Sequence, residues 1–193
     1  MGLFKSSCKD LPDEGLMQQL SAGRKDAFDE LYIRYAKKMH FFFCKMLQGD
    51  REKADDFTQN IFLKLIEKPH LFDPEMRFSS WLYRIAGNMC RNEYRRLSIR
   101  NEVQTDEELD MHHYENESSI RNIDLSAFKK ELETALDTFP QEHKMIFHLR
   151  FYEELSIKEI SEIIDCPEGT VKSRLFYSIK KLSNLLNDYN PHI

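Results

Sequence analysis

The sequence predicts an all-α protein made of two small helical domains that are joined by a flexible acidic linker. Two observations favour helices: glycine and proline number only six each among 193 residues, and the apolar residues recur at helical spacings instead of alternating. A third observation divides the chain, because a polar and acidic segment with little apolar periodicity separates two periodic halves. Either half has enough residues to bury a core.

Three helices are expected in the N-terminal half. Apolar side chains occupy one helix face over residues 26–47, and Gly49 ends that helix. A second helix is expected over about residues 51–67, because Pro69 stops it. A third helix begins near Phe78, after a turn-like segment. These helices predict a compact N-terminal domain.

Charge is distributed unevenly along the chain. A formal net charge of −5 argues against a protein that coats DNA by itself, because counterion release rewards an excess of Lys and Arg. Five arginines and one glutamate nevertheless give residues 84–100 a local net charge of +4. Residues 101–120 then carry seven acidic side chains and no Lys or Arg. The sequence therefore places an acidic spacer between two basic surfaces.

A helix-turn-helix is expected in the C-terminal half. Ser156 and Glu159 have the spacing of a capping box, in which each side chain bonds to the backbone N–H of the other residue. The helix that starts at Ile157 is short, because residues 165–167 interrupt it. Pro167 suits the first position of the following helix. The pattern is helix, tight turn, helix.

The last helix has an apolar stripe and an outward face. The residues expected inward are Val171, Leu175, Ile179, Leu182 and Leu186. Those expected outward are Ser173, Phe176, Tyr177 and Lys180, with Thr170, Lys172 and Arg174 on the flanks. Basic, hydroxyl and aromatic groups suit the DNA major groove, since Lys and Arg bond guanine edges and apolar groups contact thymine methyls. The alternative is an ordinary helical hairpin with a solvated face, and the capping box and Phe176 favour DNA binding over it.

Two segments of this half resemble a known family. Residues 166–175 (Cys-Pro-Glu-Gly-Thr-Val-Lys-Ser-Arg-Leu) resemble the recognition-helix signature of extracytoplasmic-function (ECF) sigma factors, and residues 136–140 (Leu-Asp-Thr-Phe-Pro) resemble the start of their region 4. The resemblance implies that this helix reads the minus-thirty-five promoter element. Its implied DNA contacts are Thr170, Lys172, Ser173, Arg174, Phe176 and Tyr177. Tyr177 and Ser178 depart from the Arg-Ala pair common in the family.

Residues 54–62 resemble the region 2 helix that, in the same family, docks on the clamp of the largest RNA polymerase subunit. A helix that buries Ala54, Phe57, Ile61 and Leu65 presents the opposite face to a partner. The polymerase contacts implied on that face are Asp56, Gln59, Asn60 and Leu63. Asn60 stands where the family usually has a glutamate, so one charge is missing. Without the resemblance, an ordinary polar helix face explains the pattern equally well.

Residues 78–88 resemble the family segment that captures the opened minus-ten element. The implied contacts form a basic strip on one helix face: Arg84, Asn88, Arg91 and Arg95. Cations beside an amide suit the backbone and base edges of an unpaired strand. Trp81 is expected in the core and not as a stacking platform, because it lies on the apolar side. The resemblance also implies a pocket for a flipped base in the loop at residues 71–77.

The domain boundaries follow from the resemblance and the composition. Region 2 is expected at residues 26–97, the acidic linker at 98–128 and region 4 at 129–188. Residues 1–25 are assigned only as an N-terminal segment and residues 189–193 as a C-terminal tail, so no element is predicted in either.

The resemblance implies that the partners are bacterial core RNA polymerase, promoter DNA and an anti-sigma factor, that the protein acts in the cytoplasm, and that it is not an enzyme. No metal or cofactor is expected, since the four cysteines are scattered singly and the pair His112-His113 lies in the expected linker. No apolar run has the length of a signal peptide or membrane span. The alternative is a helix-turn-helix regulator that binds an operator without polymerase, which explains only the C-terminal half.

Overall fold

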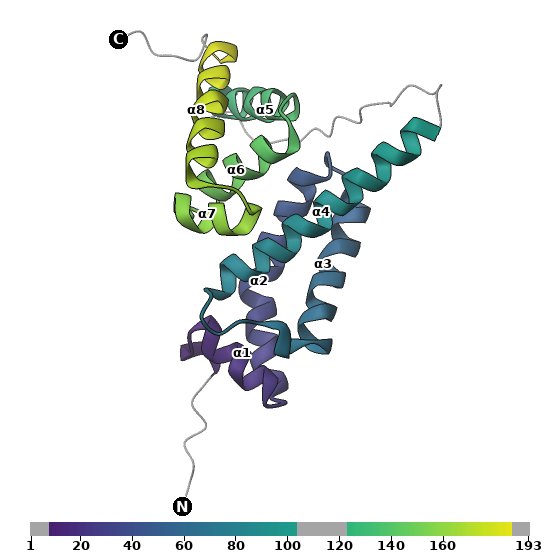
Figure 1. The fold of residues 1–193 in the computed structure, drawn as a ribbon, viewed down its shortest axis with the longest axis vertical. Helices are drawn as coiled ribbons and strands as arrows, with labels where there is room; N and C mark the ends of the chain where they lie inside the picture. The colour runs from purple at the N-terminus through teal and green to yellow at the C-terminus, as the bar shows by residue number, and fades with distance from the viewer. Residues whose placement is uncertain (1–7, 104–122, 187–193) are drawn as a thin grey trace, which may run out of the picture. The chain divides into compact units, whose positions relative to one another are not determined.

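A computed structural model describes residues 8–103 and 123–186 of the chain (Figure 1). The chain divides into two compact units, an N-terminal unit (Met1–Thr105) and a C-terminal unit (Asp106–Ile193). Within the described ranges every regular element is a helix and no strand occurs, which confirms the all-α fold class. Most of the predicted acidic linker, residues 104–122, lies outside the described residues.

Over residues 8–103, the N-terminal unit contains four α-helices and two short 3-10 helices. Their bounds are η1 (Cys8–Asp10), α1 (Asp13–Ser21), α2 (Lys25–Met46), α3 (Arg51–Glu67), η2 (Pro69–Leu71) and α4 (Phe78–Val103). The three longest helices are those that the apolar periodicity predicts. Gly49 follows α2 in the left-handed region at φ +82°, and its N–H donates to the Cys44 carbonyl oxygen at 2.9 Å. Asp50 caps α3 by accepting from the Lys53 N–H at 3.0 Å.

Aromatic side chains fill the core between α2 and α4. Phe42 and Phe78 are fully buried. Edge-to-face ring pairs join the two helices, with centroids 5.0 Å apart for Tyr35 and Phe78 and 5.4 Å apart for Phe42 and Tyr83. Trp81 is only 9% exposed, which confirms its predicted place in the core.

Helix α1 lies in a segment for which no element is predicted. Its Leu16 and Met17 are buried, and it packs mainly on α2. Asp13 accepts hydrogen bonds from the Tyr35 hydroxyl and from the Arg34 guanidinium, the latter at 2.8 Å. A helix of nine residues is too short for its apolar period to stand out in the sequence. The structure therefore adds α1 to the N-terminal helices.

Two helices extend into the segment expected to be linker. Helix α4 continues to Val103, beyond the expected domain end at residue 97. The first helix of the C-terminal unit begins at Ile123, before the expected start at residue 129. Helix ends depend on local backbone bonding and propensity, which apolar periodicity does not report.

In the C-terminal unit, residues 123–186 form four α-helices: α5 (Ile123–Asp137), α6 (Gln141–Phe151), α7 (Ile157–Ile164) and α8 (Glu168–Leu185). The predicted capping box is present at α7, where the Glu159 N–H donates to Ser156 Oγ at 3.2 Å and the Ser156 N–H donates to Glu159 Oε2 at 2.9 Å. Asp165 adopts the left-handed conformation at φ 57° and ends α7. Pro167 is the N-cap of α8, one position before its predicted place inside the helix.

The buried stripe of α8 differs from the prediction at one position. Val171 and Leu182 are buried and Leu175 is half-buried, but Ile179 is 45% exposed. Ser178 is buried in its place, and its hydroxyl donates to the backbone carbonyl oxygen four residues earlier at 2.8 Å. A serine whose hydroxyl bonds to its own helix can be buried at low cost. The prediction from apolar side chains alone therefore placed Ile179 in the core instead of its neighbour Ser178.

A buried carboxylate joins α3 to α4. Glu93 on α4 is buried, and Lys53 Nζ on α3 lies 3.0 Å from Glu93 Oε1. Arg96 donates to both carboxylate oxygens of Glu93, at 2.8 and 2.9 Å. The hydrogen bonds from Arg96, with those from Lys53, hold the pKa of Glu93 below its usual value in spite of burial.

We predict that Glu93→Gln destabilises the N-terminal unit by about 1–3 kcal/mol at neutral pH, because hydrogen bonds to a charged group are lost. A carboxyl with a lowered folded pKa contributes stability that is present above its unfolded pKa, about 4.3, and is lost as the pH falls through the folded pKa. Urea unfolding of both proteins over this acidic range should show that loss in the wild type and not in the variant. The same pH dependence in both proteins would contradict the assignment.

Candidate functional site

The outer face of α3 is exposed where polymerase contacts are predicted. Asp56, Gln59, Asn60 and Leu63 are all exposed. Leu63 has 51% of its surface exposed, and Ile66, which the sequence analysis did not single out, has 47%. Exposed aliphatic side chains beside a carboxylate and two amides have the composition of a protein interface.

The inner face of α3 differs in detail from the predicted stripe. Phe57 is half-buried, with its ring edge-to-face against Phe43 at 5.4 Å between centroids. Thr58 is buried, and its hydroxyl donates to the Ala54 carbonyl oxygen at 2.7 Å. The outward face is unaffected, because Phe57 and Thr58 are neighbours on the inner side.

The basic strip of α4 is present on one helix face. Arg84, Asn88 and Arg95 are exposed, and Arg91 is half-buried. The Arg91 guanidinium donates to Asn88 Oδ1, so the amide oxygen is held by the strip itself. An amide held in this way has N–H donors that can reach an acceptor on another molecule. Arg96 is bound to Glu93 and does not belong to the strip.

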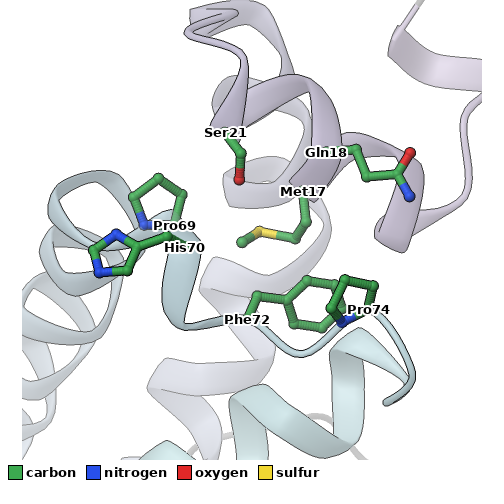
Figure 2. A pocket seen from close by; sticks show the side chains of 7 residues that line it. All are labelled: Met17, Gln18, Ser21, Pro69, His70, Phe72 and Pro74. Carbon is green, nitrogen blue, oxygen red and sulfur yellow. The ribbon is translucent and has the colours of Figure 1, made fainter.

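An open cavity of about 400 Å³ lies between α1 and the segment that precedes α4 (Figure 2). Its lining residues come from α1, from η2 and from the following loop: Met17, Gln18, Ser21, Pro69, His70, Phe72 and Pro74. In Figure 2 the Met17 thioether extends from α1 toward η2 and the loop. The family resemblance implies a pocket in the loop at residues 71–77. The sequence does not indicate the wall that α1 supplies, because no motif or spacing relates α1 to that loop.

The outward face of α8 is exposed as predicted. Lys172 and Ser173 are exposed, and Thr170 is half-buried. Phe176 and Tyr177 are 61% and 63% exposed, with their rings edge-to-face at 5.6 Å. The helix-turn-helix therefore presents hydroxyl, cationic and aromatic groups near the N-terminus of its second helix.

Two cations of α8 form ion pairs within the C-terminal unit. Lys172 Nζ lies 3.7 Å from a carboxylate oxygen of Glu168, an exposed pair that contributes little to stability. Arg174 Nη1 lies 2.6 Å from Glu142 Oε2 on α6, and Arg174 is half-buried. The sequence does not indicate Glu142 as a site residue, because its partner Arg174 is distant in the chain. This pair fixes where the Arg174 guanidinium lies.

A histidine lies next to this ion pair. His143 Nδ1 is 3.1 Å from Ser178 Oγ. Burial, and then the positive charge of Arg174, lower the pKa of His143, which keeps the ring neutral at pH 7. A neutral His143 adds no charge beside α8.

Within residues 8–103 and 123–186, no group of three or more His, Cys, Asp or Glu side chains is placed to hold a metal ion. The four cysteines are free thiols, and burial raises the pKa of Cys90 to about 12. A thiol with a raised pKa is a poor nucleophile and metal ligand at pH 7. In the same ranges no helix is long and apolar enough to cross a membrane.

Comparison with known proteins defines the class. Residues 30–99 match Sigma-70 region 2, and residues 135–184 match Sigma-70, region 4. These regions fall in the N-terminal and C-terminal units, so the chain is a sigma-70-type transcription initiation factor. It is 30% identical over 184 residues to the ECF RNA polymerase sigma-E factor of Haemophilus influenzae, covering 90% of this chain and 95% of the relative. The chain belongs to the ECF sigma factors.

Other relatives agree with this assignment. The ECF RNA polymerase sigma factor SigW of Bacillus subtilis is 29% identical over 182 residues, covering 89% of this chain and 95% of that protein. Among solved structures, CnrH in complex with the cytosolic domain of CnrY has a TM-score of 0.66 at 21% identity and covers 92% of this chain and 99% of its own. The sigma factor RpoE in complex with the anti-sigma factor NepR from Bartonella quintana has a TM-score of 0.65 at 20% identity, covering 84% and 98%. The two structures are similar to this chain in fold.

Proposed function

We propose that this ECF sigma factor binds core RNA polymerase through the outer face of α3, holds the opened minus-ten strand on the strip of α4 and reads the minus-thirty-five element with α8. The observation that carries the proposal is that all three predicted surfaces occur on exposed helix faces of the units that match regions 2 and 4. An operator-binding regulator does not explain the region 2 match. As an initiation factor, the chain would leave catalysis to the polymerase and act beside it in the cytoplasm.

The polymerase surface combines apolar contact with polar specificity. Leu63 and Ile66 supply exposed aliphatic area, while Asp56 and Gln59 supply an acceptor and an amide on the same face. Such a patch excludes water at its centre and orients the partner through its polar rim. Helix α3 is held to α4 through Lys53 and Glu93, so the surface lies on a rigid element.

Replacing Asp56, Gln59 and Leu63 together by Ala should weaken core polymerase binding by about tenfold or more, because buried interface contacts are lost. Far-UV circular dichroism should remain unchanged, since all three side chains are exposed. Lys64→Ala, an exposed change at the edge of this face, is the control. Unchanged affinity of the triple variant would place the polymerase elsewhere.

The proposed strand-capturing surface combines the α4 strip with the cavity at the segment that precedes α4. The strip supplies cations for the phosphates, and Asn88 supplies an amide for a base edge. The cavity lined by Phe72 and Met17 has the aromatic and apolar character that an unstacked base requires, and the Gln18 and Ser21 side chains offer polar groups. We assign this cavity to a base flipped from the minus-ten element.

We expect Asn88→Ala to reduce promoter opening more than polymerase binding, because its contact forms only with the separated strand. Permanganate reactivity of unpaired thymines on a duplex promoter measures opening, and holoenzyme assembly measures docking. Asn92→Ala removes an exposed amide one helical turn from Asn88, so it tests whether the effect is specific to Asn88, and it should open the promoter normally. Equal opening by the wild type and Asn88→Ala counts against the assignment.

The upstream element is assigned to the start of α8. Lys172 and Ser173 are exposed there, and Phe176 extends the surface for contact with thymine methyl groups. The Glu142 carboxylate orients the Arg174 guanidinium, so Arg174 is assigned a fixed contact with DNA while Lys172 remains adaptable.

If Lys172 reads a guanine, Lys172→Ala should cost about 1–3 kcal/mol of binding on the preferred promoter and much less on a promoter with that base changed. Holoenzyme affinity for both promoters at several salt concentrations makes the test. An equal loss of affinity on both promoters, with the slope of log affinity against log salt concentration reduced by about one, would make Lys172 a phosphate contact.

An anti-sigma factor is the third proposed partner. The support is that both similar folds named above were solved as complexes, one of them with an anti-sigma factor. Such a partner would have to cover the α3 face or the DNA-facing helices to block initiation. Purification of the chain with its bound proteins, followed by a competition assay against core polymerase, tests this point.

A further inference from the structure

Helix α1 supplies Met17, Gln18 and Ser21 to the cavity proposed for the flipped base, and it precedes the residues that match Sigma-70 region 2. We infer that α1 is a clip that positions the strand-capturing segment, and that Glu14 is its positioning residue. The inference rests on the proposed role of α4 and the adjoining cavity. The inference gives a positioning role to α1, which bonds to the start of α4 and lines the cavity.

A network of polar contacts fixes α1 on α2. Asp13 is bonded to Tyr35 and Arg34, as described above. The same Arg34 guanidinium donates to the Leu11 carbonyl oxygen at 3.0 Å and to the Lys9 carbonyl oxygen at 2.8 Å. Arg34 of α2 therefore holds Asp13, the first residue of α1, and also Lys9 and Leu11 in the segment before it. The position of Glu14 is set by this anchor.

Glu14 reaches from α1 to the start of α4. Its Oε1 accepts a hydrogen bond from the Phe78 backbone N–H at 2.9 Å. Phe78 is the first residue of α4, and the first N–H groups of a helix have no partner inside the helix. A carboxylate there also interacts favourably with the partial positive charge of the helix N-terminus. Glu14 thus acts as a cap, although it comes from another helix.

The capped residue is connected to the wall of the cavity. The Phe78 ring packs against Tyr35 at 5.0 Å and against Phe72 at 5.9 Å between centroids. Phe72 lines the cavity together with Met17 of α1 (Figure 2). Glu14 therefore fixes the point where α4 begins, and with it the loop that carries the cavity. Losing this bond lets the first turn of α4 and the loop move.

Glu14→Ala removes the cap, whereas Glu14→Gln keeps an oxygen that can accept from Phe78. The control is Asp26→Ala, because Asp26 is also a carboxylate of the N-terminal unit that accepts from an arginine, here Arg24 at 3.1 Å, and it is bonded neither to Arg34 nor to α4. Each full-length variant is assembled with core polymerase. Permanganate-detected opening of a duplex promoter and affinity for core polymerase are measured on the same samples.

We expect Glu14→Ala to lower opening about fivefold, the factor that corresponds to one helix cap, with unchanged affinity for core polymerase. Glu14→Gln should restore most of the opening, and Asp26→Ala should open as the wild type does. Hydrogen exchange at the Phe78 amide should become faster in Glu14→Ala alone, and this site-specific change would not result from a general loss of stability.

Normal opening by Glu14→Ala would overturn the inference and leave the proposed function intact. A defect in Glu14→Gln as large as in Glu14→Ala, or an equal defect in Asp26→Ala, would also overturn it, because either result makes the effect one of general packing. No opening by the wild-type holoenzyme would overturn the proposed function itself, and this inference with it.

Discussion

The placement of α4 is the constraint on which the N-terminal unit depends. One face of the helix is buried in the aromatic core, and its buried residues include Phe78, Leu82, Tyr83, Ala86 and Cys90. With 3.6 residues per turn, burial of that face turns Arg84, Asn88 and Arg95 outward. The same hydrophobic burial that stabilises the unit therefore sets the direction of the basic strip. The ion pair between Glu93 and Lys53 then holds α3, with the face proposed to bind polymerase, to this helix.

In the C-terminal unit a smaller core likewise determines which face of its last helix, α8, is exposed. The cluster of Ala135, Leu136, Phe139, Phe147 and Leu182 holds α5, α6 and α8 together. Near the start of α8, Arg174 is supported from outside that helix, because Glu142 of α6 holds it. In each unit a carboxylate from another helix therefore bonds to the helix that is proposed to contact DNA: Glu14 to the start of α4 and Glu142 to Arg174 of α8. Such pairs lower the entropy that each side chain loses on binding.

Apolar periodicity predicted α2, α3 and α4, and the capping pair Ser156 and Glu159 located the start of α7. These features are local, so the sequence contains them directly. It did not predict α1, whose nine residues are too few for a clear period, nor the burial of Ser178 in place of Ile179. It also missed the contacts that join distant segments. The bond between Glu14 and Phe78 spans 64 positions, and no spacing rule connects residues so far apart.

The most direct test of the account is transcription initiation with purified core RNA polymerase on a randomised promoter library. We predict that transcripts start at defined sites only when the chain is present, and that they require both an upstream and a downstream element. The triple α3 variant should abolish all of them, while Lys172→Ala should change which upstream elements are selected. The account would be contradicted if core polymerase initiated equally with and without the chain, and if the chain alone gave a footprint on a palindromic site.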